Sequence, residues 1–519
     1  MQLLKSTAKV GTATITSRIL GFIRDMVFAR YFGASGETDA FFLAFKIPNF
    51  MRRLFAEGSF SLAFVPVLSE VRSSGDRRAL RDLIDHVSGT LFSVLLVITA
   101  IGVLAAPLVL AIFAPGWLID GRPEFGLAAD MLRITFPYIL LISLTALAGG
   151  ILNTFDRFLV PALTPALLNI SLIASAVLLS VHMEVPVKAL AWGVLFAGIA
   201  QLAVQVPALA KLGVLPRPRW GWKHSGVRKI LKLMIPTLIG SSVAQINLLL
   251  DIVIATFLVS GSVSWLYYSD RLLEFPLGVF GVALSTVILP NLSRKFAAQN
   301  PQAFSHTLDW AMRLAVIITL PAALGLAVLA TPILITLFQY QAFQVSDVEM
   351  SALSLSAYAA GLPAFIAVKV LAPGFYARQD TKTPVKIAIT AMVSNMVLNF
   401  VFVGSLLLLD FRGPHTGLAL ASSAAAYINA GLLYHMLRKH GVYRPEPGWG
   451  RVLVAVTAAC IAMILALYWQ YGDVSGWVGA SAALRATHLT LLIGLGVFVY
   501  ALALFAAGLR RRHLEKGSF

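Results

Sequence analysis

The sequence has few charged residues and almost no cysteine. Only 13% of its 519 residues are Asp, Glu, Lys or Arg, whereas 58% are hydrophobic, and the mean hydropathy is +0.82. This composition excludes a large soluble domain and is typical of a protein with many membrane-spanning helices. The single cysteine, Cys460, excludes an intramolecular disulfide and lies in an apolar run, where we expect it to be chemically inert.

Acidic residues are scarce as well, with 24 Asp and Glu against 41 Lys and Arg and a formal net charge of +17. Basic proteins often bind nucleic acid, but here the basic residues occupy short loops between apolar runs, as the positive-inside rule expects. We therefore exclude nucleic acid as a partner. The first apolar run contains Arg18, Arg24 and Asp25 and lacks a small-residue cleavage site. We expect it to stay as a helix rather than to be removed as a signal peptide.

Apolar runs long enough to cross about 30 Å of hydrocarbon recur along the whole chain. They predict an all-α polytopic membrane protein with fourteen transmembrane helices, at roughly 8–32, 37–68, 82–114, 126–152, 158–181, 187–210, 228–258, 264–293, 305–338, 347–377, 385–408, 414–437, 452–470 and 486–509. If the N-terminus is cytoplasmic, the inner loops hold most of the Lys and Arg, and the outer loops hold only Arg122 and Arg412. This imbalance predicts that both termini lie in the cytoplasm.

An internal repeat links the two halves of the chain. Pro66 and Leu68 recur as Pro290 and Leu292, and the same spacing relates Gly150 to Gly374 and Asp156 to Asp380. The repeat pairs spans one to six with spans seven to twelve, and the two copies have the same orientation because six is even. It predicts an N-lobe at 1–222, a C-lobe at 223–441 and an extra pair of helices at 442–519. Such lobes suggest alternating access with a substrate site between them.

The stretch from Asp39 to Glu57 is highly charged for a membrane helix. Asp39, Lys46, Arg53 and Glu57 fall on nearly one stripe, and a kink at Pro48 would bring Arg52 to the same face. An ionisable side chain at the bilayer centre costs about 2.5–3.5 kcal/mol to insert, so it normally faces a protein interior or a watery cavity. Further polar stripes lie on the first span, with Arg18, Arg24 and Asp25, and on the eighth, with Ser264, Arg271 and Glu274.

Arginines in a water-filled cavity suit a phosphate or pyrophosphate, because guanidinium stays charged and offers a planar fork of donors. The alternative is that these charges only pair with each other, Arg18 with Asp25 and Arg53 with Glu57. The density of cations on three spans favours an anion site for the group.

Several segments closely resemble the MurJ (MviN) family of lipid II flippases, within the multidrug/oligosaccharidyl-lipid/polysaccharide exporter superfamily. They include SRILGFIRD at 17–25, TDAFFLAFKIPNFMRRLFAEGSFSLAFVPVLSE at 38–70, SGSVSWLYYSDRLLEFPLGVFGVAL at 260–284 and KVLAPGFYARQDTKTPVKIA at 369–388. The resemblance runs essentially end to end. It implies a transporter rather than an enzyme, acting in peptidoglycan and cell-wall biogenesis in the bacterial inner membrane.

The resemblance also implies the substrate, lipid II, an undecaprenyl-pyrophosphate-linked disaccharide-pentapeptide moved from the cytoplasmic to the periplasmic leaflet. The substrate-binding candidates are Arg18, Arg24, Asp39, Lys46, Arg52, Arg53, Glu57, Ser264 and Arg271. We expect the arginines to hold the pyrophosphate and the carboxylates to hold the arginines apart. Spans thirteen and fourteen would form a groove for the lipid tail or merely buttress the second lobe. Membrane lipids and other cell-wall synthesis proteins are further expected partners.

The coupling of transport to an energy source is left open by the sequence, and no cofactor is expected. Asn247 and Asp251 lie one turn apart on span seven, as do Asn395 and Asn399 on span eleven, so their oxygens could converge on Na⁺. Interhelical hydrogen bonding is the favoured alternative for these amides. H⁺ coupling and the membrane potential, at about 2.3 kcal/mol per charge per 100 mV, are the other possibilities.

Two rival functions remain. A flippase for another polyprenyl-pyrophosphate oligosaccharide would need the same cations. A membrane glycosyltransferase or ligase would need a sizeable outer loop with catalytic carboxylates or histidines, and the outer loops here are short. A drug antiporter for organic cations is disfavoured by the arginines.

Overall fold

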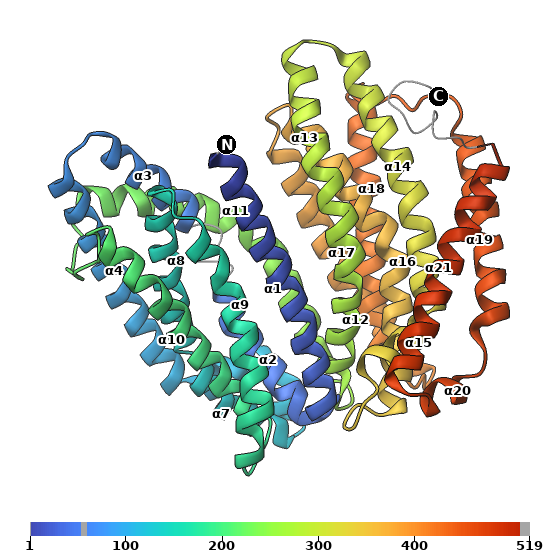
Figure 1. Cartoon of the computed structure of the whole chain (residues 1–519), viewed down its shortest axis with the longest axis horizontal. Coiled ribbons are helices and arrows are strands. Elements are labelled where there is room, and N and C mark those ends of the chain that lie inside the picture. Colours follow the sequence, from blue (N-terminus) through green and yellow to red (C-terminus); the bar gives the residue numbers. More distant parts are fainter. Residues whose placement is uncertain (1, 53–59, 509–519) are drawn as a thin grey trace. The chain divides into compact units, whose positions relative to one another are not determined.

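The computed structural model describes residues 2–52 and 60–508, with side chains described except at 2–10 and 236–248. Within these residues the regular elements are helices joined by turns and loops, and there is no strand (Figure 1). It divides into two compact units, Met1–Ser264 and Trp265–Phe519. The prediction of an all-α protein is therefore confirmed. The predicted domain boundaries at 222/223 and 441/442 stay predictions.

In the described part of the chain, the first unit is built of α-helices and short helical turns. Their bounds are α1 (Gln2–Phe32), α2 (Gly36–Arg52), α3 (Ser61–Ser73), α4 (Arg77–Leu104), α5 (Ala106–Phe113), α6 (Pro115–Ile119), α7 (Pro123–Thr135), α8 (Tyr138–Thr154), α9 (Leu159–Ala174), α10 (Lys188–Lys211) and α11 (Ser225–Ala255). The π-helical turn η2 (Ser175–Leu179) and the 3-10 turn η3 (Ser180–His182) continue α9. Helix α1 packs against α9, and α11 packs against α3 and α4.

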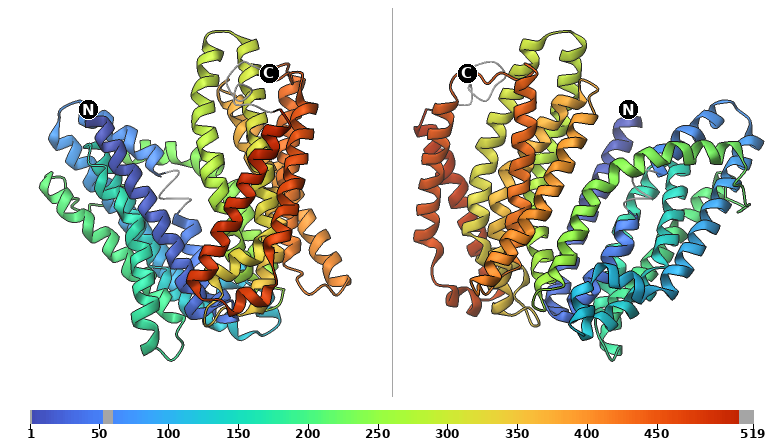
Figure 2. Two further views of the ribbon diagram at one scale, coloured as in Figure 1. Left: turned by 45° about the vertical axis from the view of Figure 1, so that its right-hand side comes forward. Right: turned by 180° about the vertical axis from the view of Figure 1, so that it is seen from behind.

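The second unit begins within the first turn of α12. Its helices are α12 (Ser262–Pro276), α13 (Val282–Ala297), α14 (Pro301–Val328), α15 (Ala330–Phe338), α16 (Val345–Tyr376), α17 (Lys382–Leu408), α18 (Thr416–Lys439), α19 (Trp449–Tyr471), α20 (Val474–Gly479) and α21 (Ala482–Ala506), with the π-helical turn η4 (Leu277–Gly281) joining α12 to α13. Helix α16 packs against α14 and α18, and α19 packs against α21 (Figure 2).

Eleven helical segments among the described residues are long and apolar enough to cross a membrane. Helices suit this environment because the bilayer core offers no water to unpaired backbone groups, and a helix satisfies its own. The chain is therefore a multi-pass membrane protein.

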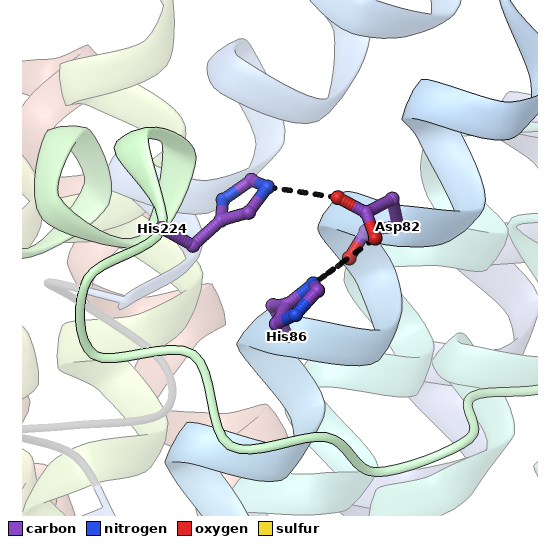
Figure 3. A group of neighbouring side chains, drawn as sticks. All are labelled: Asp82, His86 and His224. Carbon is purple, nitrogen blue, oxygen red and sulfur yellow. Dashed lines mark hydrogen bonds and ion pairs between the residues drawn. The ribbon is translucent and has the colours of Figure 1, made fainter.

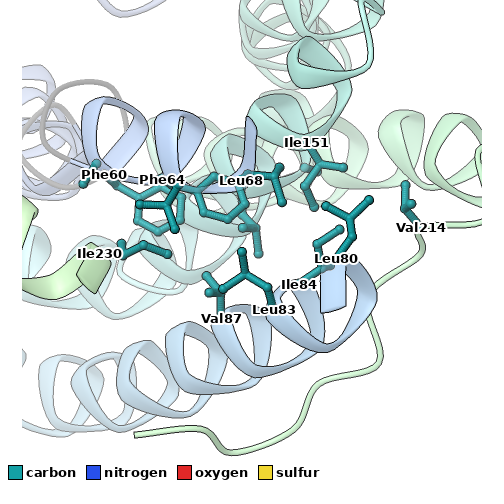
Figure 4. Close-up of a cluster of buried hydrophobic side chains, with 14 of the residues drawn as sticks. Phe60, Phe64, Leu68, Leu80, Leu83, Ile84, Val87, Ile151, Val214 and Ile230 are labelled. Carbon is teal, nitrogen blue, oxygen red and sulfur yellow. The ribbon is translucent and has the colours of Figure 1, made fainter. Parts of the chain in front are cut away.

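The core of the first unit lies where α3 and α4 meet α8 and α11. Buried Phe60, Phe64 and Leu68 pack there against Leu83 and Ile84 of α4, as Figure 4 shows. This packing fixes α4 beside the loop that leads into α11, because Val214 of that loop and Ile230 of α11 belong to the same cluster.

The core of the second unit is joined to its loops by a buried ion pair on α14. Arg313 Nε lies 2.7 Å from Asp309 Oδ2, and both side chains are 1% exposed. The other oxygen, Asp309 Oδ1, accepts hydrogen bonds from the Tyr443 hydroxyl and from Trp449 Nε1, each at 2.8 Å. Burial and the Asp309 carboxylate raise the pKa of the Tyr443 hydroxyl, so this group stays a donor. The pair thus holds the 440–449 loop against α14.

Removing the charge of Asp309 should destabilise the second unit. In Asp309→Asn the guanidinium of Arg313 would stay buried without its counter-charge, a situation that costs about 3–5 kcal/mol in buried pairs. We expect a clearly lower thermal unfolding midpoint in detergent. Asp410→Asn is the matched control, because Asp410 is exposed and its positive φ of 51° is tolerated by Asn. Equal midpoints for the two variants would contradict a stabilising role of the pair.

Candidate functional site

The guanidinium of Arg24 is buried inside the apolar helix α1. Its Nη2 lies 2.6 Å from Asp25 Oδ1, and its Nε donates to the same oxygen at 3.0 Å. Its Nη1 donates to Asn169 Oδ1 of α9 at 3.1 Å. Arg24 is 6% exposed and Asp25 is 1% exposed. Although neighbouring residues on a helix point in different directions, the long Arg24 side chain reaches back to Asp25.

Asn169 is a residue of this site that the sequence analysis missed. Its side chain accepts from Arg24 and donates Nδ2–H to the Ser17 carbonyl at 3.0 Å, so it fixes the guanidinium relative to the α1 backbone. It lies against Gly21, where an added Cβ would stand 3.5 Å from Asn169 Nδ2. A polar amide in the middle of the apolar run 158–181 was the available signal, because such amides usually bond between membrane helices.

Asp39 and Ser264 lie far apart in the sequence but are in contact in the structure. Asp39 Oδ1 accepts from the Ser264 amide at 2.7 Å and from Ser264 Oγ at 2.5 Å, while Oδ2 accepts from the Gly261 amide at 2.7 Å. Both residues are at most 2% exposed. A carboxylate on the first amides of a helix satisfies groups without intrahelical partners and complements the helix dipole. The structure therefore gives Asp39 the role of a cap on α12. Contact of Asp39 and Ser264 with substrate stays a prediction.

The other cations of the opening stretch are less buried. Arg52 donates to Asn49 Oδ1 from Nε at 2.9 Å and from Nη2 at 2.8 Å, one helical turn away. Lys46 and Arg52 are half-buried, and Arg18 of α1 is exposed. Arg53 and Glu57 lie outside the described residues, so their predicted places on the stripe are not tested.

Arg271 belongs to the second unit, on α12. Its Nη1 lies 2.5 Å from Glu274 Oε2, and its guanidinium stands 5.8 Å from the centre of the Tyr267 ring. Arg271 is half-buried, while Tyr268 is fully buried. Tyr267, Arg271 and Glu274 therefore form one connected group.

A second polar residue of α12 is fixed by α16, and the sequence analysis did not single it out. Trp265 Nε1 donates to Asp347 Oδ1 at 3.0 Å, and Asp347 Oδ2 accepts from the Gln344 amide at 2.9 Å. The Trp265 ring also lies 5.0 Å from the ring of His415. This arrangement fixes the first turn of α12 within the second unit.

The amides proposed as cation ligands are buried and bonded to each other. Asn399 Nδ2 donates to Asn395 Oδ1 at 3.1 Å, and Asn395 Nδ2 donates to Ser422 Oγ of α18 at 3.4 Å. The bond to Ser422 is of the interhelical kind, whereas the bond between the two asparagines lies within α17. Asp251 is half-buried on α11 in the first unit, and the Asn247 side chain lies outside the described ones. A cation site that joins the two pairs stays a prediction.

Comparison with known proteins places the chain in a family. A family model described as lipid II flippase MurJ matches residues 28–487. A probable lipid II flippase MurJ of Vibrio cholerae is 49% identical over 99% of this chain and 98% of its own length. A lipid II flippase MurJ of Burkholderia cenocepacia is 43% identical over 95% of this chain and 96% of its own length.

Solved structures agree with this placement. A lipid II flippase MurJ in an inward closed conformation is similar with a TM-score of 0.79 and 28% identity, covering 95% of this chain and 97% of the other. An inward-facing multidrug resistance MATE transporter of the MOP superfamily, at 14% identity and a TM-score of 0.66, shares the fold over 82% of this chain and 95% of its own. The chain belongs to the lipid II flippase MurJ family, and it is a transporter rather than an enzyme.

Proposed function

We propose that this chain moves lipid II from the cytoplasmic to the periplasmic leaflet of a bacterial inner membrane by alternating access. The observation that carries the proposal is the buried guanidinium of Arg24, held by Asp25 and Asn169 within a membrane helix of a family member. A pyrophosphate is the part of lipid II that such a donor recognises, because guanidinium offers parallel N–H groups and a permanent charge. Family membership favours lipid II over other polyprenyl-pyrophosphate oligosaccharides.

The proposed substrate site combines cations of α1, α2 and α12. Arg18, Arg24, Lys46, Arg52 and Arg271 would provide the positive charge, with Arg53 as a further donor. Asp25 and Glu274 would hold Arg24 and Arg271 in place and compete for them when the substrate leaves. Asp39 would act indirectly, because as the cap of α12 it would orient the helix that carries Arg271.

Fourteen spans follow if three further segments cross the membrane besides the eleven apolar ones. Helices α1 and α11 have 31 residues each, about 46 Å at 1.5 Å per residue, which is ample for a bilayer. Arg18, Arg24 and Asp25 interrupt the apolar run of α1, whereas residues 233–250 of α11 contain no Asp, Glu, Lys or Arg. The third segment is the stretch that contains α2 and α3. The positive-inside rule then puts both termini in the cytoplasm.

The helix pair α19 and α21 suits the undecaprenyl tail. The two helices pack on each other, and large apolar side chains stay exposed along both, including Leu465 and Trp469 on α19 and Leu491 and Phe498 on α21. An exposed apolar surface of this kind would suit contact with any membrane lipid. The proposal that it binds the lipid tail therefore rests on the position of the helix pair in the chain, after the two copies of the internal repeat.

Substituting Arg24, which is buried, or Arg271, which is half-buried, should abolish transport. Removing a hydrogen bond to a charged group costs about 1.5–3 kcal/mol, or roughly 10- to 100-fold in substrate affinity. We expect Arg24→Ala and Arg271→Ala to fail in supporting growth of a flippase-depleted strain at normal membrane levels. Arg30→Ala is the matched control, because Arg30 is exposed in the last turn of α1 and should support growth. Full growth of the Arg24 and Arg271 variants would refute the pyrophosphate site.

Asn169→Ala should weaken lipid II binding through Arg24. The amide positions the guanidinium, so we expect several-fold weaker retention of lipid II in native mass spectrometry of the purified protein. The sharper measurement is a double-mutant cycle with Arg24→Ala. If Asn169 acts through Arg24, its substitution should have little further effect once Arg24 is gone. Independent, additive losses would contradict the positioning role.

Coupling to Na⁺ would depend on the amides of α17. Asn399→Ala removes the bond to Asn395 and one oxygen ligand, and we expect a reduced dependence of lipid II transport on Na⁺ in reconstituted vesicles. Thr390→Ala is the control, because its exposed hydroxyl bonds only within α17, to the Lys386 carbonyl. An unchanged Na⁺ response in Asn399→Ala would exclude these amides as the Na⁺ site.

A further inference from the structure

Three side chains of the kinds that bind transition metals meet where the loop before α11 crosses α4. Asp82 and His86 stand one helical turn apart on α4, and His224 is contributed by the loop. Figure 3 shows both imidazole rings directed at the two oxygens of the Asp82 carboxylate. This cluster takes no part in the proposed substrate site.

The separations within the cluster are close to those of a coordination sphere. His224 Nε2 lies 3.1 Å from Asp82 Oδ2, and His86 Nδ1 lies 3.3 Å from Asp82 Oδ1. One ligand atom from each of the three residues falls within 4.8 Å of the others. Ligands at about 2.0–2.1 Å from a tetrahedral Zn²⁺ are separated by roughly 3.3–3.4 Å. The three side chains are therefore within reach of one ion once the His86 ring turns from the Asp82 backbone carbonyl, which lies 2.8 Å from its Nδ1.

Hydrogen bonds from loop amides to α4 hold the loop before α11 in place. The Arg219 amide donates to the Asp85 carbonyl at 3.0 Å, and the Gly221 amide donates to Thr90 Oγ1 at 3.1 Å. Helices α4 and α11 are themselves fixed by the apolar core shown in Figure 4. His224 therefore already lies beside α4 before a metal ion binds, so less conformational entropy is lost on binding.

We propose that Asp82, His86 and His224 form a Zn²⁺ site that clips the loop before α11 to α4. Two imidazoles and one carboxylate suit Zn²⁺, whereas Mg²⁺ and Ca²⁺ prefer oxygen ligands alone. The side chains are partly exposed, 22% for His86 and 24% for His224, so water can reach the ion as a fourth ligand.

Zinc binding changes the hydrogen bonds of His224. The Gly226 amide donates to His224 Nδ1 at 3.1 Å as the cap of α11, so the ring proton lies on Nε2 and points at Asp82. Zn²⁺ takes the place of that proton on Nε2 while Nδ1 takes up a proton from water, so the bound ring is the neutral Nδ1–H tautomer and no net proton is released. The Gly226 amide then loses His224 Nδ1 as its acceptor and must donate to water instead. The ion and the helix cap therefore compete for His224, and the site binds more weakly than one whose ligands have no other task.

The test is calorimetric titration of the tag-free, full-length protein in detergent with ZnCl₂ after removal of metal by a chelator. We expect one Zn²⁺ per chain and no comparable binding of Mg²⁺. His86→Gln and His224→Asn should weaken Zn²⁺ binding at least tenfold. His224→Asn is informative because Asn is a good helix cap, so it removes the imidazole while preserving the start of α11. His440→Asn, at an exposed position outside the cluster, should bind as the wild type does.

Hydrogen exchange of the wild-type protein provides a second measurement that needs no variant to fold. Zn²⁺ should slow exchange of the loop amides between Gly213 and His224. Equal Zn²⁺ affinity in wild type, His86→Gln and His224→Asn would overturn the proposal. So would Zn²⁺ binding that leaves exchange of this loop unchanged.

Discussion

The cost of burying a charge where water is excluded governs the polar structure of this protein. An isolated ion in a low-dielectric interior is unstable, so each buried charge needs a counter-charge or several hydrogen bonds. Arg24 has Asp25 and Asn169, and Arg313 has Asp309. Arg485 shows another solution, since its guanidinium donates to the carbonyls of Ile335 and Gln339 at the end of α15 and to that of Val478. A cation at a helix C-terminus is also favoured by the dipole.

These charged groups divide into those that hold the fold together and those suited to a moving substrate. The Asp309–Arg313 pair is closed by Tyr443 and Trp449 and joins a loop to a helix, so nothing in it calls for a ligand. Arg24 is different because it lies on α1 of a chain in the lipid II flippase family, whose substrate carries a pyrophosphate. Asp25 and Asn169 hold its guanidinium in one orientation, which would lower the cost of orienting it for a pyrophosphate bound there as we propose.

Helix capping also connects residues that are far apart in the sequence. Asp39 of α2 accepts from the first amides of α12, and His224 accepts from the start of α11. In both cases one side chain serves a helix terminus while belonging to a polar cluster. A residue with two such tasks couples the order of a helix end to whatever else binds the side chain. For Asp39 this links the start of α12 to α2, and for His224 it links the start of α11 to α4 through Asp82.

From the sequence alone we could predict the class of the protein, its long helices and its family, and could single out Arg24 and Arg271 as charges within apolar runs. Apolar run length sets where a helix can span a bilayer, and a charge within such a run is conspicuous without a structure. Only the tertiary structure decided the partners of those charges. Asn169 on α9, the cap that Asp39 provides for Ser264, and the meeting of His224 with Asp82 all join residues far apart in the chain. Helix packing brings them together, and periodicity within one segment carries no information about which face of another helix it will meet.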